Sequence, residues 1–175
     1  LSAALAAVTP IMAAHTAKTQ TQANFIWLGD IEPERQSETS AAIAASGCAG
    51  RIHLIPFAAD TRPYYDSADV FALTSREDPF PSVLLEALDT GLSAVAFQGA
   101  GGFDALANSA GAALVERDNI DAFASAVARF IQDPTLRSSV RQQATAAIAC
   151  DFSMRGYAYD LADHMAAKVP RISVV

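Results

Sequence analysis

The sequence has few of the residues that build disulfide frameworks, metal centres and nucleophilic sites. It contains two cysteines, Cys48 and Cys150, which lie far apart and form no paired motif. This spacing excludes a disulfide framework and a cysteine-based zinc site, and it is typical of a protein in a reducing compartment. No group of histidine and acidic residues has metal-ligand spacing, so we expect no metal. No Gly-x-Ser-x-Gly motif occurs, so a serine nucleophile is not expected.

Positive charge and long apolar runs are scarce as well. Lys and Arg number 12 against 19 Asp and Glu, which leaves a net charge of −7 and no basic run. Because binding to a phosphate backbone needs clustered cations, we expect no nucleic-acid partner. No apolar run reaches the length of a membrane span, so we expect a cytoplasmic protein, peripheral to a membrane at most. The start lacks the methionine and basic residues of a signal peptide, and we expect this chain to be a piece of a longer protein.

What the sequence does contain is a regular alternation of strand and helix patterns. Apolar residues make up 51% of the chain, enough for one domain with a real core. Short apolar strands are predicted at 25–28, 52–55, 70–73, 93–97 and 112–115. Helices are predicted at 2–17, 33–45, 62–67, 81–89, 103–108, 120–132, 135–149 and 153–168. Short continuous apolar strands between helices predict an α/β fold, a Rossmann-like doubly wound parallel sheet with helices on both faces.

The loops that follow strands are the candidate site, because ligands of such folds bind beyond the carboxyl ends of the strands. The loop after residue 73 runs into a helix that we expect to begin at Pro81. The amides of Ser82 to Leu84 then lie at the positive end of the helix, which accommodates an anion such as phosphate. Glu86 lies one turn further on, and Asp78 lies just before the helix. Both carboxylates accept hydrogen bonds, which suits ligands rich in hydroxyl groups.

The same residues also have a plainer interpretation. The helix carries five apolar residues that are expected in the core: Val83, Leu84, Leu85, Ala87 and Leu88. Its polar residues Ser82, Glu86 and Asp89 could then be only the wet face of an amphipathic helix. Arg76 could be solvated or ion-paired, and the glycines at 99–102 could serve a tight turn. Periodicity alone leaves the two interpretations open.

One continuous stretch resembles a known family. Residues 64–88 read YYDSADVFALTSREDPFPSVLLEAL, which is similar to the signature of the group 1 retaining GT-B glycosyltransferases. The similarity extends upstream to residues 25–29 and downstream through Gly101 and Gly102. It also takes in residues 133–137, Asp-Pro-Thr-Leu-Arg, so that it covers nearly the whole chain. The resemblance places the chain in the C-terminal, donor-binding half of such an enzyme.

The resemblance implies a role for each candidate residue. The family carries two acids eight positions apart, which correspond here to Asp78 and Glu86. Glu86 would hold the ribose hydroxyls of the donor nucleotide, and Asp78 would contact hydroxyls of the donor sugar. Further contacts to the donor sugar and phosphates would come from Phe80, Pro81, Ser82 and Val83. The nucleotide base would lie along Ile55 and Phe57, and further phosphate or sugar contacts could come from Arg76, Gly101 and Gly102.

The sequence departs from the family pattern in three places. The first acid is Asp78 where the family has Glu, and Phe103-Asp104 follows the glycines where a Glu is usual. The family also places a Gly-Arg strand end and a Lys before this region to neutralise the donor diphosphate, and neither cation is present. A diphosphate without cationic partners binds weakly. We therefore expect weak donor binding and no sugar transfer by this chain alone.

The resemblance implies an enzyme that moves a sugar from a nucleotide diphosphate sugar to an acceptor hydroxyl, with retention of configuration and without a cofactor. The setting would be polysaccharide or glycoconjugate synthesis, and the acceptor would bind in an N-terminal domain that this sequence lacks. Two alternatives stay open. One is another GT-B enzyme, such as a nucleotide-sugar epimerase or a sucrose-type synthase. The other is a non-catalytic α/β interaction module within a polymer-synthesis protein.

The last residues suggest a domain boundary. We predict a nucleotide-sugar-binding domain over residues 1–169 and a linker or the start of a following domain over 170–175. The segment Pro-Arg-Ile-Ser-Val-Val at 170–175 resembles the first strand of a GT-A-type glycosyltransferase domain, although a plain C-terminal extension is equally compatible. Residues 172–175 could also fill the middle of the sheet, where the family has a first strand that is absent here.

Overall fold

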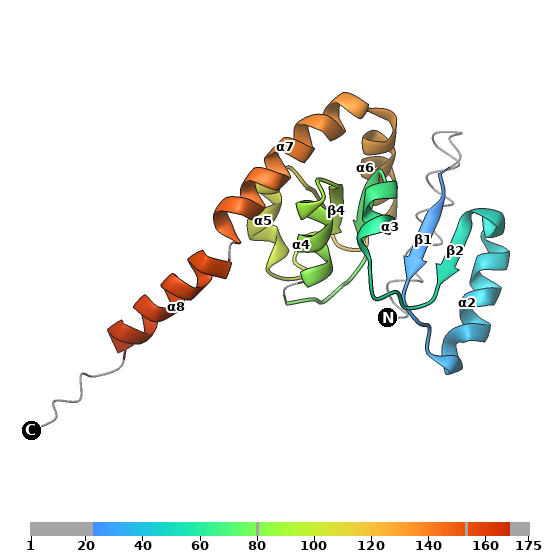
Figure 1. Ribbon diagram of the computed structural model, residues 1–175. Helices are drawn as coiled ribbons and strands as arrows, with labels where there is room; N and C mark the ends of the chain where they lie inside the picture. The colour runs from blue at the N-terminus through green and yellow to red at the C-terminus, as the bar shows by residue number, and fades with distance from the viewer. Residues whose placement is uncertain (1–22, 80, 153, 169–175) are drawn as a thin grey trace, which may run out of the picture.

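The computed structural model describes residues 23–79, 81–152 and 154–168, which form an α/β fold with parallel strands and helices on both faces (Figure 1). The strands are β1 (Phe25–Leu28), β2 (Ile52–Ile55), β3 (Val70–Leu73), β4 (Ser93–Phe97) and β5 (Ala113–Val115). The helices are α2 (Pro33–Ala45), η1 (Ala49–Arg51), α3 (Arg62–Ser67), α4 (Ser82–Asp89), α5 (Phe103–Ala110), α6 (Ile120–Gln132), α7 (Pro134–Asp151) and α8 (Met154–Lys168). The helix expected at 2–17 and the segment 170–175 lie outside the described residues.

The described strands pair in two parallel sheets. β1 pairs with β2, and β3, β4 and β5 form a second sheet in that order. The parallel character that the sequence predicted is confirmed. Among the described strands no pairing joins the two sheets, and the family resemblance implied that one strand of the usual sheet is absent from this sequence.

The core is centred on β4, whose five residues are all buried. Ala94 and Ala96 face a cluster built by α4, α5 and α7, and Val95 and Phe97 face a second cluster built largely by α6. Phe97 packs against Phe123 of α6, with ring centroids 4.8 Å apart. The continuous apolar run of β4 is therefore explained by helices that cover both faces of the strand.

The outer strand pair is less buried than its apolar sequence predicted. Ile26 of β1 and Leu54 of β2 are 42% and 40% exposed. The buried side of this pair lies against α2 and η1, where Cys48 and Ile52 form a small cluster with Phe25. Full burial of strands on both faces thus holds for β4 and is wrong for β1 and β2.

The first two helices after β5, α6 and α7, begin with side-chain caps. Asn119 accepts a hydrogen bond from the Ala122 amide at 3.0 Å, and Asp133 accepts one from the Leu136 amide at 2.8 Å. Asp133 followed by Pro134 is a typical helix start, with a capping side chain and then proline as the first helical residue. These caps fix the start of α6 and of α7, and both helices pack on the second sheet.

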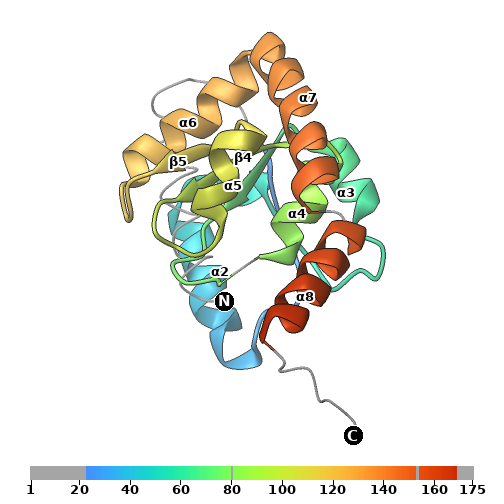
Figure 2. The same cartoon turned by 90° about the vertical axis from the view of Figure 1, so that its left-hand side faces the viewer.

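The last helix, α8, extends away from the rest of the domain (Figure 1) and lies in front of it in the view of Figure 2. The helix predicted at 153–168 is confirmed. Its apolar residues Tyr157, Leu161 and Met165 share one side by their spacing, and all three side chains are exposed in the described structure.

Candidate functional site

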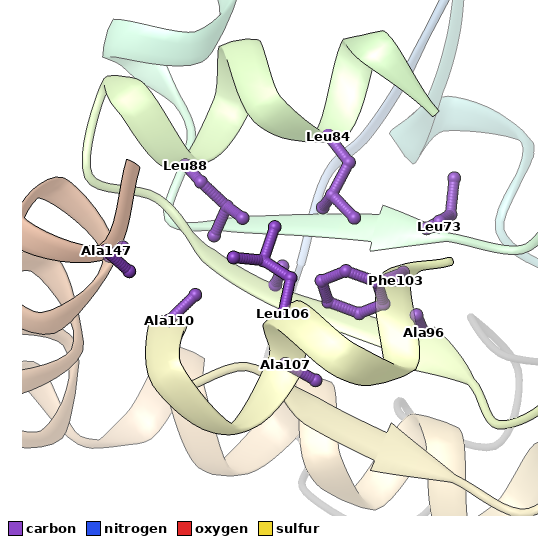
Figure 3. Packing of buried hydrophobic residues seen from close by; sticks show 11 residues of the cluster. Leu73, Leu84, Leu88, Ala96, Phe103, Leu106, Ala107, Ala110 and Ala147 are labelled. Carbon is purple, nitrogen blue, oxygen red and sulfur yellow. The ribbon is translucent and has the colours of Figure 1, made fainter. Parts of the chain in front are cut away.

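The position of α4 decides which of its residues can meet a ligand. Leu84 and Leu88 are at most 1% exposed, and they point toward Phe103 and Leu106 of α5 (Figure 3). Because Leu84, Ala87 and Leu88 occupy the buried face, the exposed face carries Ser82, Glu86 and Asp89. Val83, predicted in the core, is 43% exposed, since it lies off the Leu84–Leu88 stripe.

The start of α4 differs from the prediction by one residue. Pro81 is the residue before the helix, with extended backbone, and Ser82 is the first helical residue. The Leu84 amide donates to the Pro81 carbonyl at 3.1 Å, so it is not one of the free amides that the sequence predicted. An anion at this helix end would therefore meet the first turn through Ser82 and Val83. Phe80 lies outside the described residues.

Glu86 is held by two side chains at the start of α3, from Thr61 just before the helix and from Tyr65 within it. Oε2 of Glu86 accepts hydrogen bonds from Oγ1 of Thr61 and from the hydroxyl of Tyr65, each at 3.3 Å. The Tyr65 hydroxyl also lies 3.3 Å from the carbonyl oxygen of Val83. Within the described residues, Oε1 of Glu86 makes no hydrogen bond, and the side chain is exposed. One carboxylate oxygen is thus anchored, while the other can accept from a ligand.

The same contacts change the acidity of Tyr65. Partial burial raises the pKa of the Tyr65 hydroxyl above its usual 10.0, and the negative charge of Glu86 and the hydrogen bond to it act in the same direction. A hydrogen bond with Thr61 opposes these effects. The phenol therefore stays protonated at neutral pH and remains a donor to the carboxylate.

Asp78 lies where two loops are joined through their backbones. Its amide donates to the carbonyl of Ala100 at 2.8 Å, and the Gly102 amide donates to the carbonyl of Pro79 at 2.9 Å. The loops come so close that a Cβ at position 101 would collide with the backbone carbonyl of Asp78. Gly101 is therefore required by the approach of the two loops, which brings Asp78, Gly101 and Gly102 together at the carboxyl ends of β3 and β4.

Asp104 is hydrogen-bonded to the glycine-containing loop at residues 99–102. Its Oδ2 accepts a hydrogen bond from the Gly99 amide at 2.9 Å, while Phe103 beside it is buried in the core. The sequence marked this position only as a departure from the family pattern. The structure shows a local reason for an acid there, since it orders the loop that faces Asp78.

Arg76 is engaged within the protein. Its Nε lies 2.9 Å from Oδ1 of Asp118, and Arg117 donates to its backbone carbonyl. Both members of the Arg76–Asp118 pair are about half exposed, so solvent screens the interaction. In this structure Arg76 thus adopts the ion-paired arrangement that the sequence left open beside a phosphate contact.

The predicted base segment is tied to the loop after β1. The Gly29 amide donates to the carbonyl of Ile55 at 2.9 Å, and the Phe57 amide donates to Oδ1 of Asp30 at 3.2 Å. The side chain of Phe57 is 72% exposed. A hydrogen-bonded backbone therefore presents an exposed aromatic ring in the loop that joins β2 to α3.

The structure thus assembles the candidate residues in three groups. One joins Asp78 to the glycine loop, one joins Glu86 to α3, and one joins Ile55 and Phe57 to the β1 loop. The sequence missed Thr61 and Tyr65, whose four-residue spacing on a helix was the available signal. Among the described residues there is no cluster of His, Cys, Asp and Glu able to hold a metal, and no helix able to cross a membrane.

This arrangement of parallel strands, covering helices and loops at the carboxyl edge defines a Rossmann-like domain of the GT-B type. A family profile described as "Glycosyl transferases group 1" matches residues 2–133. The chain therefore belongs to the group 1 glycosyltransferases.

A curated relative and two solved structures show how far the similarity extends. The lipopolysaccharide core biosynthesis glycosyltransferase LpsE of Rhizobium meliloti is 27% identical over 130 residues, which are 74% of this chain and 38% of LpsE. Anabaena HepE, solved in complex with UDP, superposes with a TM-score of 0.79 at 20% identity, over 90% of this chain and 44% of HepE. The C-terminal domain of the group 1 protein LpcC from Francisella tularensis has a TM-score of 0.73 at 17% identity, over 85% of this chain and 79% of that structure. The chain thus spans less than half the length of LpsE and of HepE.

Proposed function

We propose that this domain binds the nucleotide diphosphate sugar donor of a retaining glycosyltransferase. The full-length protein would transfer the sugar to an acceptor hydroxyl in polysaccharide or glycoconjugate synthesis. The observation that carries the proposal is Glu86, a solvent-exposed carboxylate on a helix whose opposite face is locked in the core. Two similar proteins support it, since LpsE is a lipopolysaccharide core biosynthesis glycosyltransferase and HepE has been solved with UDP-glucose.

Each group of the site has a task in this proposal. Glu86 accepts hydrogen bonds from the ribose hydroxyls, and Asp78 accepts them from hydroxyls of the sugar. The first turn of α4 lies toward the diphosphate, where its partial positive charge stabilises the negative charge that develops as the nucleotide leaves. Ile55 and Phe57 lie along the base. Retention predicts that the anomeric configuration of the product equals that of the donor.

The charge of the domain limits how tightly it can hold a donor by itself. The diphosphate needs cations, whereas Arg76 is paired with Asp118 and the chain carries a net charge of −7. Without cations to balance its charge, a diphosphate close to Asp78 and Glu86 would be repelled by both carboxylates. We therefore infer that cations other than Arg76 must balance the diphosphate in the full-length protein.

The proposal is tested by the donor affinity of the full-length protein. Wild type is first screened by calorimetry against nucleotide sugars, beginning with UDP-glucose because HepE has been solved with it. Glu86→Ala should weaken binding of the best donor by about 10- to 100-fold, the range for hydrogen bonds to a charged group. Asp89→Ala, on the same exposed face of α4 and one turn further on, is the matched control and should change affinity by less than about twofold.

The outcome separates the enzyme from the alternative of an interaction module. A protein that binds no nucleotide sugar, or one in which Glu86→Ala and Asp89→Ala bind as wild type does, would contradict the proposal. Equal losses in both variants would point to a general effect of charge on the helix instead of a contact at Glu86.

A further inference from the structure

The hydrogen bonds from the start of α3 to Glu86 reach only one of its two carboxylate oxygens. Thr61 and Tyr65 both approach the same carboxylate oxygen, Oε2, and neither hydroxyl forms a hydrogen bond with Oε1. A glutamate on an exposed helix face is ordinarily free to rotate among several side-chain conformations. Two donors on one oxygen restrict that rotation and leave the second oxygen available.

The two donors are themselves held in place. They lie four residues apart, and the Tyr65 amide donates to the Thr61 carbonyl at 3.3 Å, so the first turn of α3 sets their spacing. The ring of Tyr65 packs edge-on against Phe71 of β3, with centroids 6.1 Å apart and planes at 68°. The sheet thus directs the phenol hydroxyl toward α4.

We propose that Thr61 and Tyr65 are positioning residues that orient Glu86 for ribose, so that the α3–α4 contact sets the preference of the site for ribonucleotides over deoxyribonucleotides. This inference rests on the proposed function, in which Glu86 contacts the ribose. By occupying Oε2, the two hydroxyls leave Oε1 to accept from the ribose hydroxyls. Because Thr61 directly follows the loop after β2, the same contact fixes the distance between the base segment and the ribose acceptor.

A purely structural role is the competing explanation, since the Tyr65 hydroxyl also lies 3.3 Å from the Val83 carbonyl in the first turn of α4. If the hydroxyl only supports the start of α4, its loss would lower the affinity for every ligand of the site equally. If it orients the carboxylate, its loss would lower the affinity only for ligands that present the ribose hydroxyl. The ratio of affinities for a ribonucleotide and its deoxy counterpart therefore distinguishes the two explanations.

The experiment measures that ratio in the full-length protein by calorimetry. The probes are UDP, GDP, ADP and CDP, each paired with its 2′-deoxy and 3′-deoxy forms. Tyr65→Phe and Thr61→Val remove one hydroxyl each and keep the size of the side chain. Thr61 makes no side-chain cap on α3, so its replacement leaves the helix start intact. Tyr64→Phe removes a neighbouring hydroxyl and serves as the control, because the hydrogen bonds to Glu86 within the described residues come from Thr61 and Tyr65.

Wild type should prefer the ribonucleotide, and Tyr65→Phe and Thr61→Val should each reduce that preference by about three- to tenfold. The affinity for the deoxynucleotide should stay as in wild type, and Tyr64→Phe should leave both affinities unchanged. Equal weakening of ribo and deoxy ligands, unchanged ratios in both variants, or no preference in wild type would overturn the inference. A separate Glu86→Ala measurement keeps the two proposals apart, because unchanged donor affinity there contradicts the proposed function itself.

Discussion

At the scale of single residues, the site depends on close approaches that the sequence could not reveal. The motif at 78–86 marked Asp78 and Glu86 as candidates, because acids around a helix start after a strand can be recognised in the sequence. The partners of these acids were not predictable. The contact between Tyr65 and Glu86 joins residues 21 positions apart and depends on how α3 packs beside α4.

Gly101 offers a prediction at this scale. Gly101→Ala should destabilise the protein by about 1–3 kcal/mol and weaken donor binding, because the new methyl group collides with the Asp78 carbonyl and forces the two loops apart. Urea unfolding followed by circular dichroism measures the stability. Gly50→Ala is the control, since a Cβ at position 50 meets no atom within 4 Å, and its effect should stay within about 0.5 kcal/mol. Equal stabilities of the two variants would contradict the close approach of the loops.

At the scale of helices and strands, the sequence predicted local structure well and burial less well. The bounds of β1, α2, β2, α3, β3, β4 and α6 agree with the prediction, because each depends on a short-range pattern or on a cap. The burial of a side chain depends on which helices and strands pack against each other. Leu161 of α8 has the same apolar spacing as a core residue, yet it is exposed, because α8 extends away from the domain.

Two leucines test this difference between pattern and burial. Leu88→Ala on α4 should lower the free energy of unfolding by about 2–5 kcal/mol, since a fully buried side chain leaves a cavity. Leu161→Ala on α8 should lower it by less than about 1 kcal/mol, because the side chain is 43% exposed. Urea unfolding of both variants provides the comparison. A loss at Leu161 as large as that at Leu88 would show that α8 is packed against another part of the protein.

At the scale of the whole molecule, the class of fold was predictable, whereas the pairing of its strands was not. Alternating strands and helices specify a parallel α/β architecture. The grouping into β1–β2 and β3–β4–β5 depends on which strands pair, and periodicity in the sequence does not report strand pairing. The chain also spans only 38% of LpsE and 44% of HepE. Sugar transfer by this protein is thus a property to be measured on the full-length molecule.

The most direct test of the central claim is a crystal structure of the full-length protein with the nucleoside diphosphate of its best-binding donor. The account predicts a ribose hydroxyl within hydrogen-bond distance of Oε1 of Glu86, with Oε2 still bonded to Thr61 and Tyr65, and the diphosphate at the start of α4. A nucleotide whose ribose lies away from Glu86, or one bound on another surface of the domain, would contradict it.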